Sequence, residues 1–145
     1  MRIRDFREYD RAACLALFDS NVPAYFLTDE RDAFADFLTS PMGRFYVVED
    51  DQTNVVGCGG WYIDGSVAGL SWGMIDRRLH GRGYGRFLLQ QRLRAIREDG
   101  RAQTARVRTT PSVQGFFEHK QFKVIRDGLK GAAPEGRLVE LTLAL

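Results

Sequence analysis

Apolar residues recur along the chain at two spacings, and each spacing predicts one kind of element. In four segments they recur every three or four residues, which is the period of an amphipathic helix. These segments begin after Asp10, at Thr28, at about Gly83 and at Pro111. The third segment is the longest, because it continues to about Glu98, and Gly100 follows it as a helix stop.

Seven other segments have the short, apolar pattern of strands and are bounded by turn residues. They run from Ile3 to Phe6, Arg44 to Glu49, Val55 to Ile63, Val67 to Asp76, Thr104 to Thr109, Phe122 to Ile125 and Leu138 to Leu143. The predicted order is therefore β-α-α-β-β-β-α-β-α-β-β. Because no repeat, low-complexity tract or long linker interrupts it, we expect one domain spanning residues 1–145, of the fold class α/β (α+β).

Composition places the chain among globular proteins. It has 145 residues, of which 44% are hydrophobic and 28% are charged. A chain of this length buries roughly 70% of the surface that its unfolded form exposes. These values exclude the disordered, fibrous and collagen-like classes. The net charge of +2 is too small to favour nucleic acid as a partner.

Membrane, secreted and metal-binding classes lack their characteristic residues here. No stretch approaches the ~18 consecutive apolar residues of a membrane span, and the segment from Met1 to Asp5 lacks the apolar core of a signal peptide. We therefore expect a cytoplasmic protein with no membrane partner. The only cysteines, Cys14 and Cys58, are expected to be buried hydrophobic residues. Two distant histidines complete no ligand cluster, so no metal is expected.

A glycine-rich turn, His80-Gly81-Arg82-Gly83-Tyr84-Gly85-Arg86, carries the strongest chemical signal. It lies between a predicted strand and the longest predicted helix. Glycines at alternate positions let the backbone turn tightly and approach a ligand, and the free N–H groups at a helix start favour an anion. A phosphate or pyrophosphate is the expected ligand, although a tight strand-to-helix connection without a ligand would use the same residues.

Two common nucleotide-binding motifs do not fit this turn. A Walker-type loop needs Lys and then Ser or Thr after its last glycine, whereas Gly85 is followed by Arg86 and Phe87. A dinucleotide-binding turn needs the spacing Gly-x-Gly-x-x-Gly near the first strand of a βαβ unit. The spacing here is Gly-x-Gly-x-Gly, and it occurs late in the chain.

The turn resembles the main motif of the GNAT superfamily of acyl-CoA-dependent N-acetyltransferases, which is Arg or Gln-x-x-Gly-x-Gly or Ala, followed by a helix. Here the motif is His80-Gly81-Arg82-Gly83-Tyr84-Gly85, followed by Arg86-Phe87-Leu88-Leu89. A second family motif, aromatic-Glu-Lys-x-Gly-Phe, resembles Phe117-Glu118-His119-Lys120-Gln121-Phe122. The order of elements also matches along essentially the whole chain. The resemblance implies a mixed, mostly antiparallel central sheet flanked by helices.

The resemblance also implies acetyl-CoA as the acyl donor and assigns residues to it. The turn would bind the pyrophosphate, and the preceding strand would pair with the pantetheine arm through Met74 and Ile75. Thr110, at the position of a frequent family Asn, would hydrogen-bond the same arm. The implied cofactor-binding residues are Met74, Ile75, Gly81, Arg82, Gly83, Tyr84, Gly85, Arg86, Thr110 and Phe117.

Besides Thr110, three positions depart from the family pattern. His80 replaces the Arg or Gln that opens the main motif, which leaves binding by the backbone amides intact. Gln121 replaces a glycine and suggests a less tight turn. Phe117 stands where the family often has a Tyr that protonates the departing thiolate, and a phenyl ring has no proton to give. Either the thiolate leaves unaided, or another group such as Tyr84, Ser112 or His119 acts as the acid.

The implied reaction is direct attack of an amine on the thioester, which needs a proton acceptor but no covalent nucleophile. The candidate bases are Asp76, Glu49 and Glu30. An ordered water could serve instead, and each carboxylate could equally be a solvated or capping residue. The acceptor is expected to be a primary amine of a small molecule or a peptide. Trp61, Tyr62 and Trp72 either shape its pocket or belong to the core of the sheet.

The sequence leaves other functions and partners open. Phe117 and His80 are also compatible with a non-catalytic acyl-CoA-binding or sensor module on the same fold. The arginines between Arg77 and Arg108 could bind nucleic acid, although most of them are expected on solvated helix faces. The strand from Leu138 to Leu143 could pair across a homodimer.

Overall fold

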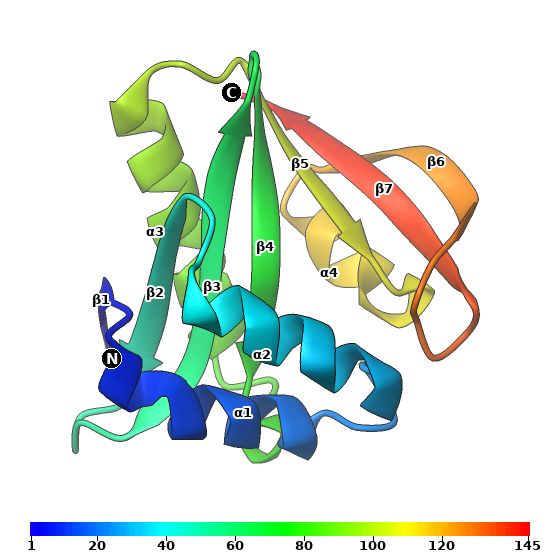
Figure 1. The fold of residues 1–145 in the computed structure, drawn as a ribbon. Coiled ribbons are helices and arrows are strands. Elements are labelled where there is room, and N and C mark those ends of the chain that lie inside the picture. The colour runs from blue at the N-terminus through cyan, green and yellow to red at the C-terminus, as the bar shows by residue number, and fades with distance from the viewer.

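One mixed sheet of seven strands organises the computed structural model, which describes residues 1–145 (Figure 1). The strands are β1 (Arg2–Asp5), β2 (Arg44–Glu49), β3 (Val55–Asp64), β4 (Val67–Ile75), β5 (Thr104–Thr109), β6 (Lys123–Lys130) and β7 (Arg137–Ala144). Their order across the sheet is β1-β2-β3-β4-β5-β7-β6. Every neighbouring pair is antiparallel except β4 and β5. The mixed, mostly antiparallel sheet implied by the sequence is confirmed.

Four α-helices cover the two faces of the sheet. They are α1 (Arg11–Ser20), α2 (Arg31–Thr39), α3 (Tyr84–Asp99) and α4 (Gln114–His119). Figure 1 shows α1 and α2 on one face, where Phe18 and Phe34 are fully buried, and α3 behind the sheet. Each α-helix is preceded by a short 3-10 helix. These are η1 (Glu8–Asp10) before α1, η2 (Thr28–Glu30) before α2, η3 (Arg77–Leu79) before α3 and η4 (Pro111–Val113) before α4. Helices and strands follow in the predicted order.

Element boundaries differ from the prediction where exposed residues extend an element. β6 continues to Lys130, well past the expected end at Ile125. The apolar pattern did not predict this extension because most residues of β6 are exposed and show no apolar alternation. The helix expected from Thr28 begins as the 3-10 turn η2 and becomes α-helical only at Arg31. Gly100 ends α3 as expected, with a φ of 82°, a left-handed conformation that suits glycine.

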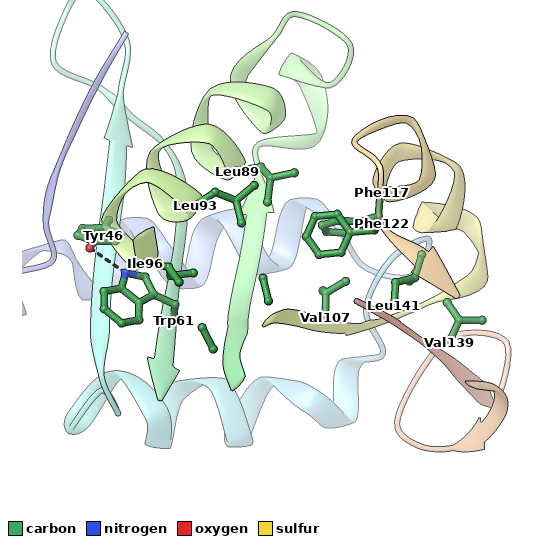
Figure 2. Close-up of a cluster of buried hydrophobic side chains, with 12 residues drawn as sticks. Tyr46, Trp61, Leu89, Leu93, Ile96, Val107, Phe117, Phe122, Val139 and Leu141 are labelled. Carbon is green, nitrogen blue, oxygen red and sulfur yellow. Dashed lines mark hydrogen bonds between the residues drawn. The ribbon is translucent and has the colours of Figure 1, made fainter. Parts of the chain in front are cut away.

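The largest hydrophobic cluster lies between the sheet and α3 (Figure 2). Leu89 and Ile96 of α3 pack in it together with Val107 of β5 and Leu141 of β7. Trp61 is buried in this cluster, and its Nε1 donates a hydrogen bond to Tyr46 Oη at 3.0 Å. Because the cluster includes residues from both β3 and β7, α3 holds the two halves of the sheet together. Trp61 is therefore a core residue of the sheet.

The edges of the sheet are β1 and β6. β7 pairs with β5 on one side and with β6 on the other. The strand that the sequence offered for pairing across a homodimer, Leu138 to Leu143, therefore has both sides paired within its own chain. Its backbone groups are not available to a second copy.

The sequence also makes predictions for the cysteines, the helices and the possible metal ligands, and the structure places each of them. Cys14 and Cys58 are both fully buried and free, as expected. None of the helices combines the length and the apolar composition that crossing a membrane needs. No group of His, Cys, Asp and Glu side chains is arranged to hold a metal ion.

A buried ion-pair network holds β1 to the sheet. Glu49 is buried in β2 and accepts hydrogen bonds from Arg2 Nη2 at 2.5 Å and from Arg4 Nε at 3.1 Å. Arg4 also donates to both carboxylate oxygens of the buried Asp10, at 2.8 and 2.9 Å. The hydrogen bond from Arg2 contributes most to holding the pKa of Glu49 below its ordinary value. This contribution to stability is present above the ordinary pKa and is lost as the pH falls through the lowered one.

Glu49→Gln is expected to lower the free energy of unfolding at pH 7 by about 2 kcal/mol, because it removes the charge that pairs with two guanidinium groups. The unfolded chain gains its proton near pH ~4.3, at a higher pH than the folded protein does. The difference between variant and wild type should therefore shrink as the pH falls below that value. Urea denaturation at pH 7 and at pH 3.5 measures it, and a difference that stays constant contradicts the assigned role.

Candidate functional site

β4 and β5 are parallel neighbours that pair over only three residues. Val67–Gly69 pairs with Thr104–Arg106, and beyond these pairs the strands diverge (Figure 1). β4 continues to Ile75 with no partner on this side, whereas β5 continues to Thr109 paired only with β7. We call this unpaired stretch the β4–β5 gap. The divergence leaves the carboxyl-terminal parts of both strands without hydrogen bonds to each other.

β4 contains a bulge where it borders the gap. The register with β3 shifts between Cys58 and Gly60, so that Trp72 and Gly73 together oppose Gly59. Trp72 has a φ of 45°, in the left-handed region that bulky residues rarely adopt. Because a bulge leaves its extra residue out of the strand ladder, Trp72 lacks a regular strand partner on β3, and its carbonyl oxygen accepts only a long contact from Cys58 Sγ at 3.8 Å.

The glycine-rich turn follows β4 and η3 and leads into α3. Gly81 and Gly83 have φ values of 77° and 91°, which only glycine adopts without strain. The first backbone hydrogen bond of the helix runs from Phe87 N to Gly83 O at 3.0 Å, so the three amides before Phe87 donate to no acceptor in the protein. The start of a 16-residue helix therefore presents free N–H groups and the positive end of its dipole.

Positive side chains flank these free amides. Arg82 and Arg86 are both exposed, and neither forms a hydrogen bond or an ion pair within the protein. The first turn of α3 has no acidic residue. Arg82 also lines a surface hollow of about 470 Å³ together with Asp76 and Arg78. An anion at the glycine-rich turn would therefore meet two unpaired guanidinium groups.

Two buried hydroxyl groups have no hydrogen-bond partner in the protein. They are Ser71 Oγ on β4, where the strand borders the gap, and Thr110 Oγ1, directly after the end of β5. A buried hydroxyl without a partner is unfavourable, so both positions suit a ligand that supplies one. Thr110 is among the residues that the sequence assigns to the donor. Ser71 is not, because a single serine in a strand carries no signal.

Met74 and Ile75, which the sequence also assigns to the donor, turn their side chains away from the gap. Met74 is buried with the α1 and α2 residues, and Ile75 is buried against Leu88 of α3. The Ile75 carbonyl oxygen is already occupied, because Asn21 Nδ2 and His80 Nε2 each lie 2.9 Å from it. A carbonyl oxygen only accepts, so His80 carries its proton on Nε2. His80 thus anchors the glycine-rich turn to the end of β4.

Phe117 belongs to the core. It is 6% exposed and packs edge-on against Phe122, with the ring centroids 5.3 Å apart. Its neighbour Phe116 approaches the glycine-rich turn instead, since a Cβ on Gly85 would lie 3.6 Å from Phe116 Cε1. Adjacent residues of a helix point about 100° apart, so Phe117 is buried in the core whereas Phe116 is only partly buried at its border. The sequence does not decide which of the two is buried.

The turn after α4 stays tight although it lacks the glycine of the family motif. Gln121 itself adopts the left-handed conformation, with a φ of 72°. Phe122 N donates to Phe117 O at 3.1 Å, which closes the turn. The looser turn expected from Gln121 is therefore wrong, and the backbone is held by the burial of Phe117 and Phe122 on either side.

Aromatic side chains pack against the bulge on the α1–α2 face. The Trp72 ring centroid lies 5.0 Å from that of Phe34 and 6.2 Å from those of Phe26 and Phe37. Phe26, Phe37 and Trp72 are only partly buried, so this cluster forms the accessible wall beside the bulge. Tyr62 lies elsewhere, with its Oη accepting a hydrogen bond from Arg106 at 3.0 Å.

The three candidate bases lie in different surroundings. Glu49 is bound by arginines at the β1 edge of the sheet. Asp76 follows β4, and a hydrogen bond from the Arg78 side chain contributes most to holding its pKa below the ordinary value. Burial raises the pKa of Glu30 in η2, although Leu27 N donates to Glu30 Oε2 at 2.7 Å. Of the three carboxylates, only Glu30 is shifted in the direction that suits a base near neutral pH.

Two of the candidate acids lie at the ends of the two diverging strands. Tyr84 is the first residue of α3 and is half-buried against the cluster that contains Leu88. Ser112 is exposed in η4, after β5. The arrangement thus brings Tyr84, Ser112 and Thr110 to the same end of the sheet, because the carboxyl ends of parallel strands share one edge.

Arg92 is buried, whereas the sequence predicts solvated helix faces for most arginines of this region. It is 4% exposed, because it lies on the apolar stripe of α3, four residues from both Leu88 and Ile96. Its Nη1 donates to Gly60 O at 3.3 Å, and its Nε has no partner. Burial lowers the pKa of Arg92 to about 10, so the guanidinium is charged at neutral pH. The helical spacing alone could have identified this residue.

Comparison with known proteins adds a family to this geometry. Residues 41–124 match the family model of an acetyltransferase (GNAT) domain. No curated protein sequence matches the chain. Solved structures do: a GCN5-related N-acetyltransferase from Kribbella flavida shares 21% identity with a TM-score of 0.79, covering 99% of this chain and 97% of that one.

Two further solved structures share this fold. A ribosomal-protein-alanine N-acetyltransferase from Brucella melitensis shares 18% identity with a TM-score of 0.75, and each chain is fully covered (100%). The yncA protein from Salmonella typhimurium, solved with its cofactor acetyl-CoA, shares 20% identity with a TM-score of 0.74, covering 100% of this chain and 94% of that one. At identities this low, the structural matches show a common fold over nearly the whole length of the chain and nothing finer.

Replacing Arg82 and Arg86 together by Gln is expected to weaken binding of inorganic pyrophosphate about tenfold, because it removes two unpaired charges beside the free amides. Calorimetric titration at low ionic strength measures the dissociation constant. The matched control replaces Arg94 and Arg97, exposed on the same helix, and removes the same net charge. Equal weakening in both double variants would show that only the overall charge matters and would contradict a site at the turn.

Proposed function

Because the chain belongs to the GNAT family of acetyltransferases, we propose that it is an acetyl-CoA-dependent N-acetyltransferase whose acceptor is a primary amine of a small molecule or a peptide. The observation that carries this proposal is the start of α3, where free amides, two left-handed glycines and unpaired arginines lie at the carboxyl end of β4. This chemistry suits the pyrophosphate of coenzyme A.

The residues around the β4–β5 gap fit the rest of the donor. Its pantetheine arm is an extended chain with amide groups, and unpaired backbone groups along β4 can bond such a chain as an added strand would. The unpartnered hydroxyl groups of Ser71 and Thr110 offer further hydrogen bonds to these amides. The donor, when bound, supplies an acetyl group activated as a thioester.

The proposed reaction is a direct transfer. The lone pair of the amine nitrogen forms a bond to the carbonyl carbon, the bond between that carbon and sulfur breaks, and the proton lost by the amine balances the thiolate as a thiol. Nothing in this sequence of events needs a nucleophilic side chain on the protein. The protein has to hold the two reactants in line, accept the proton of the amine and exclude competing water.

Glu30 is the proposed base. Its carboxylate is only partly buried and lies on the chain between Phe26 and Phe34, two rings that contact Trp72 beside the bulge. Asp76 and Glu49 are the weaker candidates, because arginine side chains lower the pKa of each. For the proton at sulfur, Tyr84 and Ser112 are the hydroxyl groups available at this end of the sheet, since Phe117 is buried and has none to give.

The apolar wall of Phe26, Phe37 and Trp72 would receive the acceptor. Aromatic rings pack against the hydrocarbon part of an amine and also attract its cationic form. We therefore expect amines with an apolar or aromatic portion near the nitrogen to be better acceptors than highly charged ones.

Wild-type protein is expected to bind acetyl-CoA saturably in calorimetry, and replacing both Gly83 and Gly85 by Asp is expected to abolish binding, because it places two negative charges and two side chains at the phosphate site. The control replaces Gly65 and Gly128 by Asp, since both are glycines with positive φ and open space outside the turn. Absence of binding by the wild type would contradict the proposed donor. Tight binding without turnover of any amine in a broad panel would favour the non-catalytic module.

Glu30→Gln is expected to lower kcat/KM about 100-fold at pH 7 with the best amine of that panel, because an amide cannot accept the proton of the amine. In the wild type, kcat/KM should fall as the pH drops below the raised pKa of Glu30, and the variant should lack this limb of the profile. Gln keeps an oxygen for the hydrogen bond from Leu27 N, so folding should be retained. Glu49→Gln, assayed in parallel, should keep the acid limb; its loss there instead would overturn the choice of base.

A further inference from the structure

Arg92 is a buried cation without a counterion. Apart from the 3.3 Å hydrogen bond to Gly60 O, its N–H groups meet no acceptor in the protein, and its Nε is buried. No carboxylate pairs with its charge. A buried and unpaired charge destabilises a folded protein, and an apolar residue on this helical stripe would avoid that penalty.

Two glycines make room for the guanidinium beneath the bulge of β4. A Cβ at Gly73 would lie 2.9 Å from Arg92 Nη2 and 3.1 Å from Nη1, and one at Gly59 would lie 3.4 Å from Cζ. A side chain at either glycine would press on the guanidinium. Gly73 is itself exposed on the strand that borders the β4–β5 gap. The charge is therefore separated from the exposed side of the bulge only by the backbone of Gly73.

The network around Glu49 shows how this chain treats buried charges elsewhere. There, two arginines satisfy one carboxylate and Arg4 also pairs with Asp10. Two exposed arginines of α3 and the following loop also pair with carboxylates, Arg94 with Glu98 and Arg101 with Asp99. Arg92 has no such partner although it is the most deeply buried of them, which points to a role outside stability.

We propose that Arg92 is a positioning residue for acetyl transfer: its guanidinium fixes the Trp72–Gly73 bulge and holds a positive charge beneath the point where the carbonyl oxygen of the thioester becomes negative. This inference rests on the function proposed above. As the amine nitrogen bonds to the carbonyl carbon, one electron pair of the C=O bond moves to oxygen, and it returns as the C–S bond breaks. The added negative charge exists only during that passage.

A fixed cation in a water-poor interior stabilises such a charge without having to reorient at the moment of reaction. The bound donor carries no formal charge at its carbonyl oxygen, so Arg92 stabilises the transition state more than the ground state. Its removal is therefore expected to lower kcat and to leave the dissociation constant of acetyl-CoA nearly unchanged.

Arg92→Met removes the charge and keeps an unbranched side chain of similar reach. We expect a melting temperature equal to or above that of the wild type, because an unpaired buried charge is gone. Binding of acetyl-CoA by calorimetry should stay within about threefold of the wild type, whereas kcat should fall about 30-fold. The assay follows release of the CoA thiol with the best amine of the panel, or with water as acceptor where no amine reacts.

Arg92→Lys and Arg97→Met complete the first set of variants. Lys keeps the charge but carries it on a single ammonium group in place of the guanidinium fork, and it should recover part of kcat. Arg97 is exposed on the last turn of the same helix, so its replacement by Met should leave kcat, binding and melting temperature unchanged. If Arg92→Met does not fold, Arg92→Lys is still compared with the wild type. A role in packing alone predicts that the kcat and the stability of Arg92→Lys are either both retained or both lost, whereas the inference predicts a partial kcat.

Gly73→Ala tests the geometry from the other side. The added methyl group would meet the end of the Arg92 side chain before any backbone atom, so the variant should fold with the guanidinium displaced. Displacement of the guanidinium should lower kcat by a similar factor. In the Arg92→Met background the same substitution should have little further effect, because there is no guanidinium left to displace.

The outcomes distinguish the role of Arg92 from the proposed function on which it rests. A drop in kcat with unchanged donor binding, undiminished stability and non-additive effects of Gly73→Ala supports the inference. Wild-type turnover that Arg92→Met retains, or losses of kcat, binding and stability that fall together, overturns it and leaves the proposed function intact. A wild type that neither binds nor turns over acetyl-CoA overturns both.

Discussion

The early end of hydrogen bonding between β4 and β5 is the constraint on which the site depends. These strands pair over Val67–Gly69 and then separate, so one edge of β4 is left without a strand partner. The sheet does not split there, because Leu89 and Ile96 of α3 pack across the divergence onto residues of β5 and β7. The same helix therefore stabilises the opening along its length and offers free amides at its start.

Unsatisfied groups distinguish the site from the rest of the molecule. At the β1 edge, the charges of Arg4, Asp10 and Glu49 are matched by partners. Around the β4–β5 gap the hydroxyl groups of Ser71 and Thr110 and the Nε of Arg92 are buried without any. Each such group weakens folding, and a ligand or a transition state is what can compensate it. The concentration of these groups in one region supports the proposed binding of the donor there.

Prediction from the sequence succeeded where local pattern and local conformation coincide. Strands β2 and β5 have the predicted bounds because their apolar pattern and flanking turn residues are contiguous in the sequence, and Gly100 ends α3 as predicted because a helix cap involves adjacent residues. The glycine-rich turn was identifiable for the same reason, since its left-handed positions demand glycine. The sequence could not decide the burial of two neighbouring aromatic residues. Phe117 is buried in the core whereas Phe116 is partly buried and approaches the turn, and spacing within a short helix does not distinguish them.

The sequence by itself determined the order of elements, the family and the position of the glycine-rich turn, because periodicity and glycine spacing are properties of contiguous residues. Only the tertiary structure decided which charges are paired. It joined Glu49 to Arg2 and Arg4 through strands far apart in the chain, left Glu30 with a raised pKa, and buried Arg92 beneath Gly73 with no carboxylate. Electrostatic environment is a sum over neighbours from every element packed around a group, and no single segment of sequence contains that sum.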